Sequence, residues 1–503
     1  MADEKEIIHD TITFSILKYI SFSLVIVSTA VLLKLLPVSV FGIYSALMLL
    51  LDYSRFGFLI PYSASFKKIP FLRGKNSSEK EIQEVRDLSF GPTFYIMLIG
   101  TIAIFTGTYF TSQFSYELVL GIRLTALLVM LQHFNFFQTN FLRTDKRFNL
   151  VGVLELVLVA TRLVLIFALV GKYGLNGTLV AFIISYAITI ALGIYLARYR
   201  FSFSLRTFNR KAWKLFLFGL PPALVGIIAT AFVTVDKLMV IRFLDTTMLG
   251  YYSFAILVVE VISFVPNIIA TVMLPRQLEK HGQKMNTKTR LNYLVMPQQI
   301  ISYLIPFVIA AAFIFSELIT LFFFPKYLNA LPVIYILIFA SFFLSNSYSI
   351  ANYLLSVDKE KHIIIGRSIL ILFAIISNYT AIVLGYGICG VAIATLISYI
   401  LEFLYLCIVS LKAVKASGKT RTKYLIRFIF PFIYMSILLY LSSLFQHETV
   451  KNIASVLVQT CKYAGFVIIY VPLLFYLEKN TGFISTMYEY TKTAIKKLTC
   501  NFR

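Results

Sequence analysis

The sequence predicts an all-α, polytopic membrane protein with about fourteen transmembrane helices, arranged as two six-helix repeats in parallel orientation plus two further C-terminal helices. Composition, long apolar runs and an internal duplication lead to this prediction. Of the 503 residues, 59% are hydrophobic and only 14% are charged, whereas a soluble protein carries about 25% charged residues. Most of the chain is therefore expected to lie within a membrane.

The apolar runs have the length of membrane-spanning helices, which need about 20 consecutive apolar residues to cross the hydrocarbon core. Fourteen runs meet this requirement, with edges uncertain by several residues. They lie near 12–33, 38–62, 89–110, 116–140, 149–170, 174–197, 215–241, 247–274, 293–315, 329–356, 363–384, 387–411, 424–445 and 452–477.

The basic residues are concentrated in alternate loops. One set of loops holds 27 Lys and Arg residues and the other set holds 5. Because basic loops stay on the cytoplasmic side, we expect a multi-pass membrane protein with both termini in the cytoplasm. The net charge of +23 is then mainly a topology signal and an attraction to membrane lipids. Its scatter among loops argues against a nucleic-acid partner.

Two pairs of segments repeat at nearly one offset. LPVSVFGIYS at 36–45 matches LDTTMLGYYS at 244–253, and 145–186 matches 358–399 with eleven identities in 42 ungapped positions. Two such matches in corresponding positions indicate a duplicated six-helix unit. The expected divisions are an N-lobe at 1–197, a basic cytoplasmic linker at 198–214, a C-lobe at 215–411, and the last two helices with a cytoplasmic tail at 412–503. An even repeat unit gives both copies the same orientation, with a substrate path expected between them.

Ionisable residues inside the apolar runs are the candidate site residues, because a charge within a membrane is costly and usually faces a cavity or a partner. The cations suit an anionic head group, since the arginine fork binds phosphate through two hydrogen bonds. The acids are candidates for ion coupling. The cations are Arg55, Arg123, Arg162 and Lys237, and the acids are Asp52, Glu155, Asp236 and Glu260.

Each of these residues also has a structural interpretation. Asp52 and Arg55 are three residues apart on one helix face, so they can neutralise each other. Glu155 and Arg162 are seven apart and can brace one helix in the same way. The 208-residue offset places Glu260 opposite Asp52, and an acid at equivalent positions of both repeats favours a functional role over chance.

Catalytic and cofactor-binding signatures are missing from the sequence. SGKT at 417–420 lacks the first glycine of a P-loop, because position 413 is Ala413. There is no HExxH, GxSxG or DxD motif, and the predicted outer loops are short. We therefore expect a protein that is not an enzyme and that uses no cofactor and no metal.

Three stretches resemble a known family. They are DKLMVIRFLDTTMLGYYSFAILV, beginning at Asp236, MLPRQLEKHG at 273–282, and FGIYSALMLLLDYSRFGF, beginning at Phe41. With the twelve-helix duplicated core and two extra helices, they are similar to the polysaccharide flippases (O-antigen and capsule repeat-unit, Wzx-type) of the multidrug/oligosaccharidyl-lipid/polysaccharide exporter superfamily. The resemblance covers essentially the whole chain.

The resemblance implies a V-shaped, two-lobed bundle that works by alternating access. It implies an undecaprenyl-pyrophosphate-linked oligosaccharide as substrate, flipped from the cytoplasmic to the outer leaflet for O-antigen or capsule synthesis, with other polysaccharide assembly proteins as further partners. The alternatives are a cation-coupled drug or metabolite exporter or a lipid II flippase of the same superfamily. A membrane-embedded polysaccharide polymerase and a non-transporting scaffold are alternatives of other classes. The polymerase needs a long outer loop, and the scaffold leaves the charges in both halves unexplained.

Overall fold

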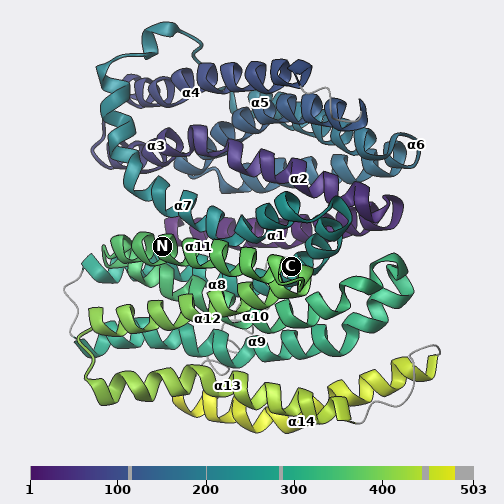
Figure 1. The fold of residues 1–503 in the computed structure, drawn as a ribbon. Coiled ribbons are helices and arrows are strands. Elements are labelled where there is room, and N and C mark those ends of the chain that lie inside the picture. Colours follow the sequence, from purple (N-terminus) through teal and green to yellow (C-terminus); the bar gives the residue numbers. More distant parts are fainter. Residues whose placement is uncertain (1, 111–115, 200, 283–286, 445–452, 482–503) are drawn as a thin grey trace, which may run out of the picture. The chain divides into compact units, whose positions relative to one another are not determined.

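The computed structural model describes residues 2–110, 116–199, 201–282, 287–444 and 453–481, and Figure 1 shows that helices dominate the fold. Short 3₁₀ helices η1 (Thr108–Phe110), η2 (Leu205–Thr207) and η3 (Pro325–Ala330) join some of the α-helices. The α-helices are α1 (Ala2–Leu35), α2 (Val38–Ser54), α3 (Phe56–Gly74), α4 (Glu79–Gly107), α5 (Tyr116–Thr144), α6 (Phe148–Ala197), α7 (Arg210–Phe243), α8 (Thr246–Gly282), α9 (Thr287–Phe323), α10 (Leu331–Ser356), α11 (Glu360–Val383), α12 (Gly387–Ala413), α13 (Gly418–Leu444) and α14 (Ile453–Thr481).

The helices confirm the predicted all-α membrane fold. In the described part of the chain, 12 helices are long and apolar enough to span a membrane, and α2 with α3, bent by 46°, makes a thirteenth span. The long α6 contains a break at Gly174 (φ 53°, ψ −127°), so its two halves account for the fourteenth predicted run. The predicted run 38–62 is too short, because the helix continues beyond Arg55 as α3 to Gly74.

The two YGxxG hairpins share a glycine with positive φ. Gly174 and Gly387 occupy corresponding places in the duplicated segments and have φ of 53° and 54°. This left-handed region is open to glycine at little steric cost. At the last glycine of each motif, Gly177 and Gly390, an added Cβ would crowd the Cβ of the motif's own tyrosine. The glycines are therefore needed in both copies for one tight turn.

The chain divides into two compact units. The first contains Met1–Lys237 and Leu244–Gly250, and the second contains Leu238–Phe243 and Tyr251–Arg503. The division falls within α7 and at the start of α8, rather than in the basic segment 198–214. The lobe boundaries derived from the duplication stay a prediction.

The core of the first unit is rich in aromatic side chains. His133 is buried, and its ring lies 5.0 to 5.3 Å from those of Phe58, Phe90 and Phe137. Its Nε2 is 2.9 Å from the hydroxyl of Thr93. Packing of this kind holds α3, α4 and α5 together.

The core of the second unit centres on α10, which packs against α9 and α12. It contains polar contacts, including hydrogen bonds from Gln298 and Ser302 to the side-chain oxygen of Asn346. A buried ion pair joins α11 to α12, with Arg367 Nε 2.6 Å from Glu402 Oε1. Buried charges of this kind need such a partner, because they have lost their hydration.

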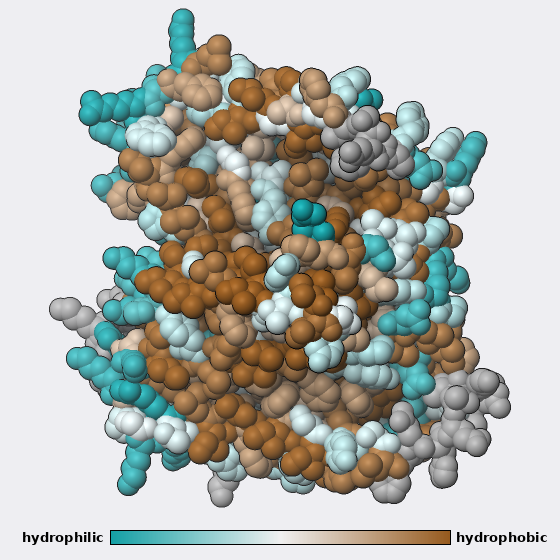
Figure 2. Space-filling view, in the orientation of Figure 1, coloured by the Kyte–Doolittle hydropathy of each residue, from teal (hydrophilic) through white to brown (hydrophobic). Residues whose placement is uncertain are grey.

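The surface has an apolar zone between polar margins. Figure 2 shows hydrophobic residues over most of the visible face, while hydrophilic groups gather along its left and right edges. Large apolar side chains such as Ile99 (67%) and Val164 (67%) are exposed. This pattern is typical of a surface in contact with lipid.

The repeated segments GIYS at 42–45 and GYYS at 250–253 each begin with a glycine of a Gly-x-Tyr-Ser motif, and these two glycines, Gly42 and Gly250, lie at a helix crossing in the first unit. A Cβ at Gly42 of α2 would overlap the carbonyl group of Thr246, and a Cβ at Gly250 of α8 would overlap that of Val38. Val38 and Thr246 are themselves related by the 208-residue offset, so the contact is reciprocal. Small residues let membrane helices approach this closely.

Asp145, in the turn between α5 and α6, is the centre of an ion-pair network in the first unit. It accepts hydrogen bonds from Arg86 (2.9 and 2.8 Å) and from Arg73 (2.9 Å). The Tyr199 hydroxyl also donates to it. Burial, together with the hydrogen bond to the Asp145 carboxylate, raises the pKa of Tyr199, so this hydroxyl stays protonated. One carboxylate therefore ties together the ends of four helices.

We predict that Asp145→Asn lowers the free energy of unfolding by about 3 kcal/mol, because it leaves the buried Arg86 guanidinium (6% exposed) without its main counterion. The measurement is the thermal midpoint of the purified protein in detergent. Asp358→Asn is the matched control, since this exposed residue occupies the corresponding place in the second copy. Equal losses in the two variants would contradict the assignment.

Candidate functional site

The candidate site starts at the break between α2 and α3. Arg55 stands between the two helices, and its backbone N–H bonds to the carbonyl oxygen of Asp52 at 3.3 Å. In a membrane, a helix can break only where other groups satisfy the freed backbone or where it lines a protein interior. Polar side chains therefore collect at this break.

Asp52 and Arg55 form an ion pair at 2.8 Å, with 35% and 39% of their side chains exposed. The guanidinium also lies over the ring of Phe136 on α5, 5.2 Å from its centroid. Partly exposed pairs of this kind contribute under about 1 kcal/mol. Arg55 is thus held in position without being locked to Asp52.

Helix α7 supplies the facing residues. The hydroxyls of Tyr53 and Thr234 are 2.8 Å apart, which joins α2 to α7. Asp236 is buried (2% exposed) and accepts a hydrogen bond from the backbone N–H of Lys237 at 2.7 Å. The half-buried Lys237 interacts electrostatically with Asp52. We call Asp52, Arg55, Asp236 and Lys237 the α2–α7 charge cluster.

Arg162 on α6 is held by aromatic rings rather than by an acid. Its guanidinium lies 4.0 Å from the centroid of Phe182 and 5.5 Å from that of Tyr186, both beyond the break at Gly174. Phe182 in turn packs edge-on against Tyr44 of the first Gly-x-Tyr-Ser motif, at 6.2 Å. In the described part of the chain Arg162 pairs with no carboxylate, and its Nε is buried without a hydrogen-bond partner.

The other predicted site residues have separate surroundings. Glu155 pairs with Lys18 of α1 at 2.5 Å, and not with Arg162. Arg123 donates from Nε to the hydroxyl of Thr108 at 2.9 Å and lies over Tyr109, so it fastens α5 to η1. Glu260 is exposed on α8 in the second unit.

Glu260 and Asp52 differ in their neighbours despite their equivalent positions. Three residues after Asp52 stands Arg55, but three residues after Glu260 stands Ser263, whose hydroxyl bonds to that of Ser345. Glu260 also lies near Tyr348 of α10. The acid recurs in both copies, and its arginine does not.

The sequence did not reveal the uncharged and long-range partners. Tyr53, Thr234 and Phe136 bracket the charge cluster, and Lys18 and Arg367 neutralise acids far away in the sequence. One pattern in the sequence could have indicated the stacked arginine. Phe182 and Tyr186 are four residues apart, so both rings lie on one helix face, where a guanidinium can stack on them.

No group of three or more His, Cys, Asp or Glu side chains is placed to hold a metal ion within the residues that the structure describes. The cations and aromatic rings of the site can instead bind an anion by hydrogen bonds and charge, with its apolar parts against the rings.

The long apolar helices and the apolar exterior define a multi-pass membrane protein. The chain belongs to the family of polysaccharide biosynthesis proteins, whose model matches residues 31–332. This confirms the family resemblance seen in the sequence. No curated protein sequence matches the chain.

Solved structures share the fold at low sequence identity. A lipid II flippase (MurJ) in an inward closed conformation has a TM-score of 0.69 and 18% identity, covering 92% of this chain and 100% of its own. An inward-facing multidrug resistance transporter (MATE) of the MOP superfamily has a TM-score of 0.63 and 14% identity, covering 79% and 96%.

A third structure bears on the polarity of the site. A MOP superfamily transporter from Pyrococcus furiosus, described as having a binding pocket of reverse polarity that suggests a different function, has a TM-score of 0.57 and 15% identity, covering 81% of this chain and 96% of its own.

Exchanging the charges of Lys18 and Glu155 distinguishes two roles of Glu155, bracing α1 and coupling an ion. We predict that Lys18→Glu or Glu155→Lys alone lowers the thermal midpoint. Each variant leaves two like charges in contact, on side chains that are only about one-third exposed. The double exchange should restore the midpoint and leave transport intact. Restored stability with transport lost would assign Glu155 to ion coupling instead.

Proposed function

We propose that the protein is a flippase that moves an undecaprenyl-pyrophosphate-linked oligosaccharide repeat unit from the cytoplasmic to the outer leaflet of a bacterial inner or plasma membrane. The product would supply O-antigen or capsule synthesis, with other polysaccharide assembly proteins acting on it. The movement would be by alternating access and would involve no catalysis. Membership of a polysaccharide biosynthesis family supports the substrate class.

The observation that carries this proposal is Arg162, a half-buried guanidinium stacked on two aromatic rings with no carboxylate beside it in the described structure. A cation inside a membrane span normally has a counter-charge or a function. A pyrophosphate supplies the counter-charge, and the fork of Arg162 matches its oxygens.

The α2–α7 charge cluster can serve as a second place for the same group. Since the ion pair of Asp52 with Arg55 contributes little, Arg55 can exchange the carboxylate for a phosphate oxygen at small cost. Lys237 adds a positive charge on the facing helix. When the substrate leaves, Asp52 can take Arg55 back, so the cluster is suited to binding and release.

The acids of this cluster also favour a second candidate, a cation-coupled exporter of drugs or metabolites. Asp52 lies beside the break between α2 and α3, and Asp236 is buried on the facing helix α7. Carboxylates inside a membrane protein can exchange a proton or a metal cation. The same fold is found in a multidrug transporter and in a lipid II flippase. The sign of charge that the substrate needs separates these candidates.

A deletion strain provides the direct test. We expect lipid-linked repeat units to accumulate on the cytoplasmic leaflet and surface glycan to disappear, because export of the unit stops. The measurements are glycan staining and leaflet-specific labelling of the lipid-linked units. Normal glycan with altered drug resistance would favour the exporter, and loss of peptidoglycan precursors from the outer leaflet would favour a lipid II flippase.

For the site, we predict that Arg162→Ala reduces glycan export at least tenfold, since a hydrogen bond to a charged group contributes about 1.5–3 kcal/mol. Arg162→Lys should fall between, because it keeps the charge and loses the fork. Arg123→Ala is the matched control, as another membrane arginine stacked on aromatic rings. With equal membrane abundance, full export by Arg162→Ala would remove this residue from the site.

A further inference from the structure

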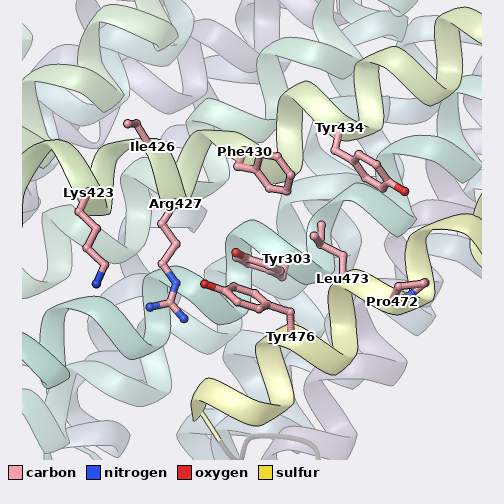
Figure 3. Close-up of a pocket in the computed structure, with 9 residues that line it drawn as sticks. All are labelled: Tyr303, Lys423, Ile426, Arg427, Phe430, Tyr434, Pro472, Leu473 and Tyr476. Atoms are coloured by element: carbon pink, nitrogen blue, oxygen red, sulfur yellow. The ribbon is translucent and has the colours of Figure 1, made fainter.

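A pocket outside the charged cluster lies between α9, α13 and α14 in the second unit. It has a volume of about 510 Å³. Figure 3 shows Lys423 and Arg427 at one end, with Leu473 and Pro472 toward the other. Its lining residues are Tyr303, Lys423, Ile426, Arg427, Phe430, Tyr434, Pro472, Leu473 and Tyr476.

The polar end of this pocket carries two positive charges. Lys423 and Arg427 are four residues apart on α13 and therefore share a face, where like charges repel. Arg427 lies over the ring of Tyr476, 5.4 Å from its centroid, and near the hydroxyl of Tyr303. None of the nine lining residues is acidic. An anion bound between the two cations would relieve the repulsion.

The rest of the pocket is apolar and opens on the lipid-facing side. Ile426 is 62% exposed and Phe430 is 45% exposed. The same side of α13 continues with the exposed Ile433 and Ile437. A soluble anion would gain nothing from these walls, whereas the chains of a lipid can pack against them by van der Waals contact.

The walls are fixed by hydrogen bonds between the helices. The Tyr434 hydroxyl donates to the carbonyl oxygen of Ile469 on α14 at 3.0 Å. The buried Tyr470 donates to the carbonyl oxygen of Tyr303 on α9 at 3.2 Å. The aromatic rings of Tyr303 and Tyr476 stack at 6.4 Å. The pocket is therefore a preformed feature of three packed helices.

The pocket's cationic end adjoins the basic segment 412–423, which the loop charges predict to be cytoplasmic. Lys423 is exposed and has no ion-pair or hydrogen-bond partner in the described structure. A phosphate there would lie at head-group depth, with acyl chains running along Phe430 and Leu473. Basic clusters at this depth attract anionic lipids of the cytoplasmic leaflet.

We propose that this pocket binds an anionic glycerophospholipid of the cytoplasmic leaflet, with its phosphodiester between Lys423 and Arg427. A phosphodiester carries one negative charge. It suits this site because Arg427 also interacts with Tyr303 and Tyr476, which leaves Lys423 as the second cation. The pocket would tie the α13–α14 pair to α9 through the lipid. This proposal concerns a resident lipid and does not depend on which substrate is transported.

The test uses the full-length purified protein in neutral detergent, titrated with dioleoylphosphatidylglycerol and, separately, with dioleoylphosphatidylcholine. Bound lipid is counted by mass spectrometry, and the thermal midpoint is followed in parallel. We expect phosphatidylglycerol to bind and stabilise the protein at a concentration at least tenfold lower than phosphatidylcholine, because only the former has a net charge.

The double variant Lys423→Ala/Arg427→Ala should lose this preference. Lys419→Ala is the matched control. It removes a cation one turn earlier on α13, and Lys419 does not line the pocket. An equal loss in the control would reduce the effect to the general positive charge of the segment and overturn the proposal. An unchanged preference in the double variant would also overturn it.

Two competitors identify the source of the phosphate. Inorganic phosphate should not displace phosphatidylglycerol, because it cannot use the apolar walls. A prenyl phosphate should compete no better than a second glycerophospholipid. Displacement by inorganic phosphate would make the pocket an ion site, and displacement by prenyl phosphate at tenfold lower concentration would assign it to the lipid carrier. Either result would overturn the assignment to a bilayer lipid.

Discussion

The structure depends on the need to satisfy every backbone N–H and C=O group without water inside the bilayer. Long helices meet this need, and they occupy most of the described chain. A span is interrupted at Arg55 in the first unit, whereas Gly174 forms the turn between the two halves of α6. Of the proposed substrate ligands, Arg55 lies at the interruption, and Arg162 lies on the first half of α6. The position of Arg55 thus follows directly from this constraint.

Two kinds of ion pair occur in the structure. Asp52 and Arg55 are partly exposed and weakly bound to each other, so a ligand can replace one of them. Arg367 and Glu402 in the second unit are almost fully buried, as Arg86 is beside Asp145 in the first. Separating such a pair costs about 3–5 kcal/mol. The first arrangement suits exchange during a transport cycle, and the second suits permanent attachment of α11 to α12.

Much of the fold was predictable from the sequence because lipid imposes a simple rule. Apolar runs of about 20 residues gave the spans, and the repeated YGxxG glycines marked turns whose φ values agree within 1°. The break at Arg55 is not predictable in this way, since the residues directly after it, FGFLIP at 56–61, are still apolar. Helix edges in apolar sequence carry no compositional signal.

The site was only partly predictable for a related reason. Intramembrane charges are rare enough to be identified singly, so all eight candidates were named. Their partners depend on which helices pack together, as with Lys18 beside Glu155 and Phe136 beside Arg55. Sequence separation of 137 residues in the first case hides the contact. The stacking of Arg162 likewise requires the turn at Gly174 to bring two halves of α6 together.

The reciprocal crossing of Gly42 and Gly250 has a consequence for how the gene can change. Each glycine faces the backbone of the first turn of the other copy. A side chain at either position would therefore collide with main-chain atoms, which no substitution can remove. In the predicted duplication, these two positions would not vary independently, because each glycine is part of the other's environment.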